Sequence, residues 1–353
     1  MSFKEIVRKN YTAILEEPEI YVDNEARKRS GHMTHAMAQF SENCFIDFNS
    51  NCSAVRWYGG HSPYGWVEYR VSRDGGKTYS DINTLPYSVE CFLDGIHVIS
   101  VEKAVACNDG SIVAFCLRND ATDYSCCEPW SSPVYVRSFD EGKTWTDPIE
   151  YSPYAGRSYD ALYHDGIIYV LHFCNEHFLG SKPEHVYRLY RSCDNGESFH
   201  ELCVVPFPDT TRRGYCSMMF DTNGALHAYA YNEACETEMD HVISYDCGVT
   251  WEVQKPCYLE KGIRNPQTAL IDGVYILHGR AGDVKGFVLY TSEDASNWDE
   301  GTMLIEKPGA AAYYSNNLNL YDEEGNFLLI QFSDTYAQDA RVNVKHMKLR
   351  IKK

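Results

Sequence analysis

Short runs of alternating apolar and polar residues, separated by turn residues, cover most of the chain. Residues 134–138 (VYVRS) and 287–292 (FVLYTS) are typical of these runs and are rich in β-branched and aromatic side chains. Other runs come in pairs around an Asp-Gly or Asn-Gly dipeptide, as in residues 105–117 and 158–173. Alternation with a period of two predicts β-strands, and these dipeptides are strong signals for hairpin turns. The pattern therefore predicts an all-β chain built from hairpins.

One turn pattern recurs five times along the chain. Its template is Ser-x-Asp-x-Gly-x-Thr-Trp, and residues 244–251 (SYDCGVTW) match it fully. Ser and Asp side chains can bind nearby backbone N–H groups, glycine supplies a positive φ, and the aromatic ring enters the core as the next strand begins. The other copies are residues 72–79, 138–145, 192–199 and 292–298, the last of which is one residue shorter and lacks the glycine.

The repeats divide the chain into six units of about four strands each. Five units contain the recurring turn, and the last, which ends in a predicted strand over residues 342–351, does not. Repeated four-stranded antiparallel sheets are typical of a β-propeller. We therefore predict an all-β, six-bladed β-propeller over residues 31–353, preceded by a short helical or extended segment over residues 1–30. We expect N- and C-terminal strands to pair in one blade and close the ring.

The composition narrows the range of partners. The 353 residues include 50 Asp and Glu against 32 Lys and Arg, a formal net charge of −18. Phosphate backbones and anionic lipid surfaces repel such a chain, so we expect neither a nucleic-acid nor a membrane partner. No apolar run is long enough to span a membrane, and the first residues lack the pattern of an export signal. We expect a cytoplasmic protein, and association with copies of itself stays open.

Cofactor motifs are absent from the sequence. The 14 Cys include no C-x-x-C pair, and neither phosphate-binding glycine motifs nor a G-x-S-x-G turn occurs. His32, His35 and His61 offer three possible metal ligands. In an extended segment, however, His32 and His35 point to opposite faces, because they are three residues apart. We expect no cofactor and no bound metal.

Five such turns on six predicted blades resemble the sialidase (neuraminidase) superfamily, whose six-bladed propellers carry Asp-box (BNR) repeats. The resemblance covers about residues 30–350. It implies that the turns lie on the outer rim, and that substrate meets the starts of the innermost strands and the ends of the second strands. It also implies a glycosidase with a Tyr nucleophile, a Glu that activates the Tyr, an Asp acid/base and three Arg that clamp a carboxylate.

Two segments resemble the family around its catalytic residues. Residues 309–332 resemble the segment of the Tyr nucleophile, which places Tyr314, or alternatively Tyr313, in that role. Residues 278–294 resemble the segment of the third arginine, which places Arg280 on the carboxylate. A neutral phenol suits attack on an anionic sugar because it meets less repulsion than a carboxylate. The planar fork of a guanidinium group matches a carboxylate.

Other positions depart from the family pattern. The first blade has His32 and His35 but no Arg, and the loop expected to hold the acid/base Asp has His61 and no carboxylate. In the fifth blade Asn265 stands where the family has Glu. Imidazole titrates near neutrality, so His61 can replace the missing acid.

Equivalent positions in the repeats predict a polar set on the substrate face. The predicted catalytic residues are Tyr314, Arg280, His61, His35, Glu233 and Asp334, of which the last two are expected to activate the tyrosine or share acid/base work. The predicted substrate-binding residues are Arg264, Asn265, Arg157, Tyr159, Glu102, Arg213, Asp120 and Glu176, with Arg118 beside them.

Three functions fit this set. The first is a glycoside hydrolase that acts on the non-reducing end of an acidic oligosaccharide, sialic acid-like or uronate, with Tyr314 as nucleophile and Arg280 on the carboxylate. The second is a uronate lyase, in which His35, His61 and Tyr314 move the protons of a β-elimination. The third is a non-catalytic glycan-binding propeller. We expect the hydrolase, with a small oligosaccharide as its substrate.

Overall fold

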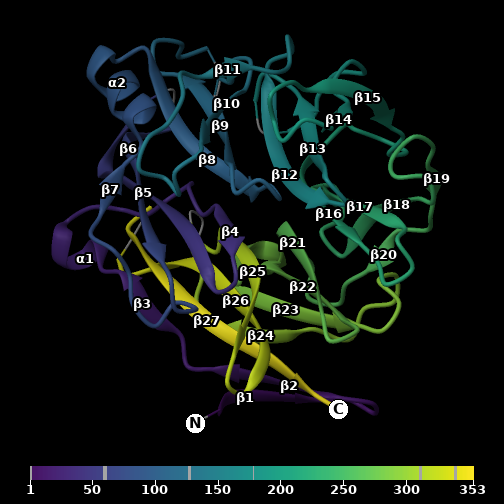
Figure 1. The fold of residues 1–353 in the computed structure, drawn as a ribbon. Coiled ribbons are helices and arrows are strands. Elements are labelled where there is room, and N and C mark those ends of the chain that lie inside the picture. The colour runs from purple at the N-terminus through teal and green to yellow at the C-terminus, as the bar shows by residue number, and fades with distance from the viewer. Residues whose placement is uncertain (1, 59–61, 126–128, 178, 310–311, 338–339) are drawn as a thin grey trace.

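Six antiparallel sheets surround a central axis in the computed structural model of the chain (Figure 1). The structure describes residues 2–58, 62–125, 129–177, 179–309, 312–337 and 340–353. The predicted all-β, six-bladed propeller of four-stranded antiparallel sheets is confirmed.

Blades one to three follow the predicted order, with successive strands running from the axis to the rim. Blade one contains β4 (Met37–Ser41), β5 (Cys44–Tyr58), β6 (Ser62–Ser72) and β7 (Asn83–Thr84). Blade two contains β8 (His97–Ala106), β9 (Ile112–Asp120), β10 (Val134–Ser138) and β11 (Ile149–Glu150). Blade three contains β12 (Gly156–His164), β13 (Ile167–Cys174), β14 (Tyr187–Ser192) and β15 (His200–Val205).

Blades four to six repeat this order with additions at their outer edges. Blade four contains β16 (Arg213–Phe220), β17 (Leu226–Asn232), β18 (Glu238–Ser244) and β19 (Glu252–Val253), and β18 also pairs with β20 (Cys257–Tyr258). Blade five contains β21 (Arg264–Ile271), β22 (Val274–Arg280), β23 (Phe287–Ser292) and β24 (Thr302–Ile305). Blade six begins with three C-terminal strands, β25 (Ser315–Asp322), β26 (Gly325–Thr335) and β27 (Val342–Lys352). Its outer strands come from the N-terminus and are β2 (Thr12–Glu16) and β1 (Ser2–Val7). A further strand, β3 (Glu19–Val22), also pairs with β27.

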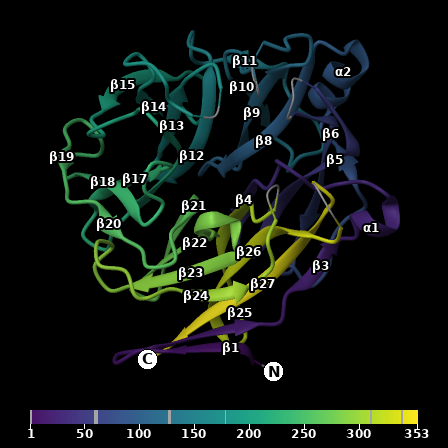
Figure 2. The same cartoon turned by 180° about the vertical axis from the view of Figure 1, so that it is seen from behind.

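The ring closes between the two ends of the chain. β2 lies antiparallel to β27, with Leu15 opposite Leu349, and β27 in turn pairs with β26. Both views show the N-terminal strands beside the C-terminal strand (Figures 1 and 2). The predicted pairing of N- and C-terminal strands in one blade is therefore confirmed. Most of the expected N-terminal segment contributes strands to blade six, and its helical part is α1 (Asn24–Arg27).

Apolar side chains pack between neighbouring blades. In the described part of the chain, a buried apolar cluster lies between each pair of adjacent blades. Between blades two and three, for example, Phe115 and Tyr135 pack with Val170 and Tyr190. Every blade has two neighbours, so both faces of its strands lose contact with water, as in β10, where all five residues are buried.

The recurring turn joins the third and fourth strands of a blade at the rim. In blade two, the Oγ atom of Ser138 accepts a hydrogen bond from the N–H group of Gly142 at 2.8 Å. Asp140 accepts bonds from the N–H group and the hydroxyl of Thr144, at 2.8 and 2.7 Å. Gly142 has a φ of 86°, which favours glycine. The ring of Trp145 then packs into the apolar cluster between blades one and two, so each turn helps to join its blade to the preceding one.

Helical structure is confined to short connections. α2 (Pro86–Asp94) begins with a proline, which cannot donate a backbone hydrogen bond, and ends at Gly95 with a φ of 74°. A 3-10 turn, η1 (Gly282–Val284), follows β22. Among the described residues, no helix combines the length and the apolar character that a membrane span requires.

Buried neutral histidines make the fold sensitive to acid. His278 on β22 contacts Ser315 and Asn317 at 3.0 Å each, and burial together with the charge of Lys103 lowers the pKa of its imidazole to about 3. Below about pH 6.5 the imidazole of His278 binds a proton in the unfolded chain but not in the folded protein. The free energy of unfolding therefore falls as the pH falls. When the pH is lowered from 7 to 5, the free energy of unfolding should fall by roughly 2 kcal/mol less in H278Q than in the wild type.

Urea unfolding at several pH values measures this difference. A parallel measurement at pH 8, where imidazole is neutral in both states, isolates the cost of the substitution itself. Identical pH dependence of the two proteins would contradict a neutral His278.

Candidate functional site

The innermost strands of blades two to five each bulge at the same level of the propeller. The pairing registers shift at Glu102 in β8, at Tyr159 in β12, between Arg213 and Cys216 in β16, and between Arg264 and Gln267 in β21. A bulge adds a residue to one strand and turns consecutive side chains toward the same side. Glu102 and the residue after it therefore both line the axial cavity, although neighbours in a regular strand point apart.

Two tyrosines meet at the centre of this level. The hydroxyl groups of Tyr314, which precedes β25, and Tyr215 on β16 are 3.0 Å apart. The ring of His35 stacks on Tyr314 with centroids 5.6 Å apart, and the ring of His32 meets its edge at 5.1 Å. The two histidines were expected to point to opposite faces, but they lie outside the strands and both reach the same tyrosine. Tyr313 instead faces the core between blades five and six, where its hydroxyl donates to the carbonyl oxygen of Lys307 at 2.8 Å. Tyr314 is thus the tyrosine that faces the axis.

Three arginines surround the tyrosine pair, and we call them the arginine cluster: Arg157, Arg264 and Arg280. The Cζ atom of Arg157 lies 5.3 Å from the ring of Tyr215 and 5.9 Å from that of Tyr314. Arg280 lies 5.8 Å from the ring of Tyr314, and Arg264 lies 5.8 Å from that of Tyr215. Guanidinium groups at these distances are attracted to aromatic faces and favour negative charge nearby. Burial opposes the charge on Arg264, but Tyr215 and the other nearby tyrosines raise its pKa.

One carboxylate is already present in the cluster. The Oε2 atom of Glu102 lies 2.8 Å from Nη2 of Arg157, and both side chains are almost completely buried. Among the described contacts, Glu102 is a carboxylate paired with the arginine cluster, in a protein whose net charge is −18.

His35 is neutral at ordinary pH. Burial, followed by the charges of Arg157 and Lys103, holds the pKa of its imidazole well below the usual range. A neutral imidazole can accept a proton, and an imidazolium formed there gives its proton up readily.

The side chain of Asn265 offers unused hydrogen-bonding capacity. The residue follows Arg264 in the β21 bulge with a φ of 57°, and its buried side-chain oxygen and nitrogen have no hydrogen-bond partner among the described residues. It lines the cavity at Tyr314. A buried unsatisfied amide is costly unless a ligand or water satisfies it. Asn265 is therefore suited to bind a polar group inside the cavity.

The cavity itself is small in the described structure. It encloses about 10 Å³, room for about one water molecule. Its lining residues are His35, Glu102, Lys103, Arg157, Tyr159, Tyr215, Cys216, Asn265, Gln267, Tyr314 and Ser315. The structure thus brings together six of the predicted residues, with Arg264 and Arg280 against the rings of the tyrosine pair.

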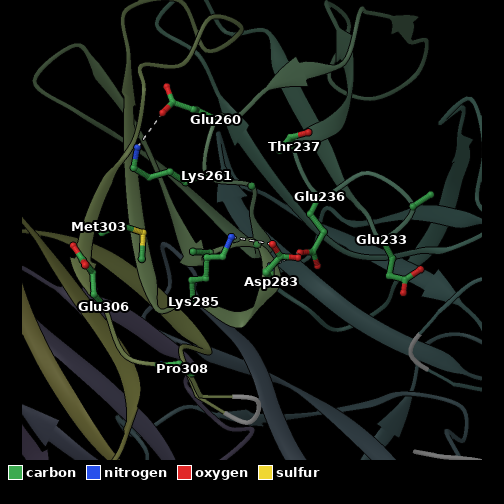
Figure 3. A pocket seen from close by; sticks show the side chains of 14 residues that line it. Glu233, Glu236, Thr237, Glu260, Lys261, Asp283, Lys285, Met303, Glu306 and Pro308 are labelled. Carbon is green, nitrogen blue, oxygen red and sulfur yellow. Dashed lines mark hydrogen bonds and ion pairs between the residues drawn. The ribbon is translucent and has the colours of Figure 1, made fainter.

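A larger pocket of about 980 Å³ lies near the arginine cluster, because its lining includes Ala281, the residue after Arg280. Figure 3 shows the side chains that line it. Glu236 and Asp283 lie together in it, and Lys285 pairs with Asp283 at 2.9 Å. The hydroxyl of Tyr231 donates to Glu236 at 2.6 Å, and the ring of Tyr231 lies 5.5 Å from Cζ of Arg264. These contacts join the larger pocket to the arginine cluster.

Neither carboxylate expected to activate Tyr314 contacts it among the described interactions. Glu233 lines the larger pocket and pairs with Arg212 at 2.5 Å. Asp334 pairs with Lys345 at 2.7 Å and reaches the hydroxyl of Tyr313 rather than that of its neighbour. Both lie at or near the ends of second strands, β17 and β26, but their side chains contact other partners.

Several predicted binding residues also lie away from the cavity. Arg213 forms a buried ion pair with Asp240 at 2.6 Å. The other residues pair locally or close a turn: Arg118 with Glu150, Glu176 with Lys182 and His185, and Asp120 with Thr122. His61 lies outside the described residues.

Sequence reasoning missed Tyr215 and Lys103. Tyr215 lies two residues after Arg213, which the sequence analysis did select, so its position was a usable signal. Lys103 gave no such signal, because only the bulge at Glu102 turns it toward the axis. Among the described residues, no three His, Cys, Asp or Glu side chains are arranged to hold a metal ion.

Comparison with known proteins supports the fold. No protein-family model matches the chain, and no curated protein matches its sequence. A protein of unknown function from Dyadobacter fermentans DSM 18053 is 14% identical, with a TM-score of 0.74 over 96% of this chain and 99% of that one.

Two sialidases of known structure are also similar. The Hadza microbial sialidase Hz136 is 11% identical, with a TM-score of 0.69 over 94% of this chain and 68% of that one. The NanB sialidase of Streptococcus pneumoniae is 10% identical, with a TM-score of 0.66 over 94% and 70% of the two chains. At such identities the similarity shows that the chain shares its propeller fold with sialidases.

The Arg213–Asp240 pair provides a test of which predicted residues are structural. Both side chains are buried, so D240N leaves a buried guanidinium group without its carboxylate and should cost about 3–5 kcal/mol of stability. Glu233 pairs with a largely exposed arginine, so E233Q, the matched control, should cost far less. Urea unfolding of the two variants compares them, and equal losses would contradict a structural role for Arg213.

Proposed function

We propose that the protein is a glycoside hydrolase that removes an acidic sugar, sialic acid-like or uronate, from the non-reducing end of an oligosaccharide. The observation that carries the proposal is the Tyr215–Tyr314 hydroxyl pair inside the arginine cluster. A phenol beside several guanidinium groups is suited to attack the anomeric carbon of a sugar whose carboxylate those groups hold. The proposal extends to this chain the activity named for the sialidases that share its fold.

The arginine cluster would bind the carboxylate of the sugar. Guanidinium groups bind carboxylates through paired charge-assisted hydrogen bonds. Asn265 would bind a hydroxyl or amide group of the same sugar with its buried side chain. Because the cavity holds about one water molecule, binding a sugar ring requires its lining side chains to move. The larger pocket would hold the rest of the oligosaccharide.

Tyr314 would act as the nucleophile. Its Oη atom forms a bond to the anomeric carbon as the glycosidic C–O bond breaks, while Tyr215 donates a hydrogen bond to the developing phenolate. His35 accepts the Tyr314 proton and passes it to the leaving oxygen. Water then adds its hydroxyl group to the anomeric carbon as the bond between that carbon and Tyr314 Oη breaks, and the remaining proton of the water returns to Tyr314. One water molecule is consumed in each cycle.

A uronate lyase is the second candidate. The neutral His35 beside Tyr314 favours it, because a β-elimination needs a base for the C5 proton and an acid for the leaving oxygen. Lyase products contain an unsaturated sugar and gain no water, so product mass separates the two reactions.

The first test is mass spectrometry of the products from sialyl-oligosaccharides and uronate-terminated oligosaccharides. Products whose summed mass exceeds the substrate by one water support the hydrolase. We expect Y314F to lower kcat/KM by about a thousandfold or more, because phenylalanine lacks the attacking oxygen. Y313F is the matched control, since that hydroxyl faces Lys307, and it should retain activity.

Other results have distinct meanings. Cleavage without added water overturns the hydrolase in favour of the lyase. Binding of either glycan by a protein that cleaves neither, with equal affinity in Y314F, overturns both in favour of a non-catalytic glycan-binding propeller.

A second test addresses the carboxylate clamp. Methyl esterification of the sugar carboxylate should lower kcat/KM of the wild type by about 10–100-fold, because charge-assisted hydrogen bonds to guanidinium groups are lost. R280Q should already have lost part of this interaction, so the ester should cost it much less. Equal losses in both proteins, measured from initial rates, would contradict a role for Arg280 in binding the carboxylate.

A further inference from the structure

Lys103 separates two cavities on the axis of the propeller. It lines the cavity at Tyr314 and also a second cavity of about 270 Å³, which Val105, Leu162 and Leu318 line further along the same inner strands. Its side chain is buried. The group therefore lies directly between the tyrosine pair and the other end of the axis.

Three oxygen atoms from three other blades hold the ammonium group of Lys103. The Nζ atom lies 2.6 Å from Oε1 of Gln267, 2.9 Å from Oδ1 of Asn316 and 3.1 Å from Oδ1 of Asp160. An ammonium group has three N–H donors, so these acceptors match it in number. The group is thus fixed in place, with blade two joined to blades three, five and six.

The second oxygen of Asp160 has its own partners. It accepts hydrogen bonds from the backbone N–H group of Met218 at 2.7 Å and from the hydroxyl of Ser217 at 3.0 Å. The carboxylate is therefore anchored to blade four, whatever stands at position 103. This property allows Lys103 to be replaced without releasing Asp160.

The charged and titratable groups that face His35 come from several blades. Its ring stacks on Tyr314, and it shares the cavity with the following residues: Glu102, Lys103, Arg157, Tyr159 and Tyr215. His32 lies against the same tyrosine. Arg157 is paired with the carboxylate of Glu102 and Lys103 with that of Asp160, and the charges of both cations act on the buried His35.

We propose that Lys103 is a positioning residue whose fixed charge opposes protonation of His35 and so keeps that imidazole available to accept a proton. The inference rests on the proposed function for its catalytic consequence, but the effect on His35 is independent of any substrate. Two cations close to one imidazole disfavour a third positive charge. Lys103 does not contact the reacting atoms in this scheme; it acts through His35.

The test is an NMR titration of the histidine rings, with the His35 signal identified by its loss in H35Q. K103M removes the charge and keeps a side chain of similar length. We expect the titration midpoint of His35 to rise by about one pH unit or more in K103M. D160N, which keeps the ammonium group, is the matched control and should show no rise. A folded K103M protein with an unchanged midpoint would overturn the inference.

The double variant K103M/D160N keeps the test available if K103M does not fold. It removes both charges of the buried pair together and so leaves no unpaired buried charge. If K103M alone does not fold, the double variant should still show the higher His35 midpoint, and an unchanged midpoint there overturns the inference equally. In an active enzyme, the pH at the midpoint of the acid limb of the kcat/KM profile should rise by the same amount. A loss of activity with an unmoved acid limb would show a merely structural role.

The two proposals fail in different ways. If no product forms from any acidic oligosaccharide, the proposed function is wrong, while the titration still decides the effect of Lys103 on His35.

Discussion

The buried ammonium group of Lys103 joins four of the six blades at the axis. Its acceptors lie on the innermost strands of blades three and five and on that of blade six, while the lysine belongs to blade two. Apolar packing holds each blade to its neighbours but has no direction, so it does not fix how the inner strands meet. Directional hydrogen bonds at the axis fix how the inner strands meet. Loss of the Asp160 carboxylate would leave the buried ammonium group of Lys103 without its opposite charge.

The bulges in the inner strands convert this framework into a site. Without them, strand alternation would allow only every second side chain to face the axis. The bulges turn Glu102, Tyr159, Tyr215 and Asn265 inward, where they line one cavity together with Lys103. The tyrosine pair and the arginine cluster depend on this arrangement, because their side chains come from different blades.

Charge is distributed unevenly over the molecule. The chain as a whole is strongly acidic, yet its axis gathers the arginine cluster and Lys103 around two buried carboxylates. An acidic surface repels long polyanions, whereas guanidinium groups attract a carboxylate placed among them. This contrast supports the small acidic oligosaccharide of the proposed function over a polymer. The neutral state of His35 comes first from burial and then from the charges of Arg157 and Lys103.

The sequence by itself determined the fold. Strand alternation, hairpin dipeptides and the recurring Ser-x-Asp turn act over a few residues, so they can be read without the structure and they gave the six blades and the closure of the ring. Local resemblance also placed Tyr314 and Arg280, which the structure brings together.

Tertiary structure alone decided the partners of these residues. Glu233 and Asp334 occupy the expected strand ends, but side-chain contacts with Arg212 and Lys345 hold them away from Tyr314. Tyr215 became the partner of Tyr314 because a register shift in β16 turned it inward. Register, bulges and contacts between blades arise from residues far apart in the sequence, and no local pattern encodes them.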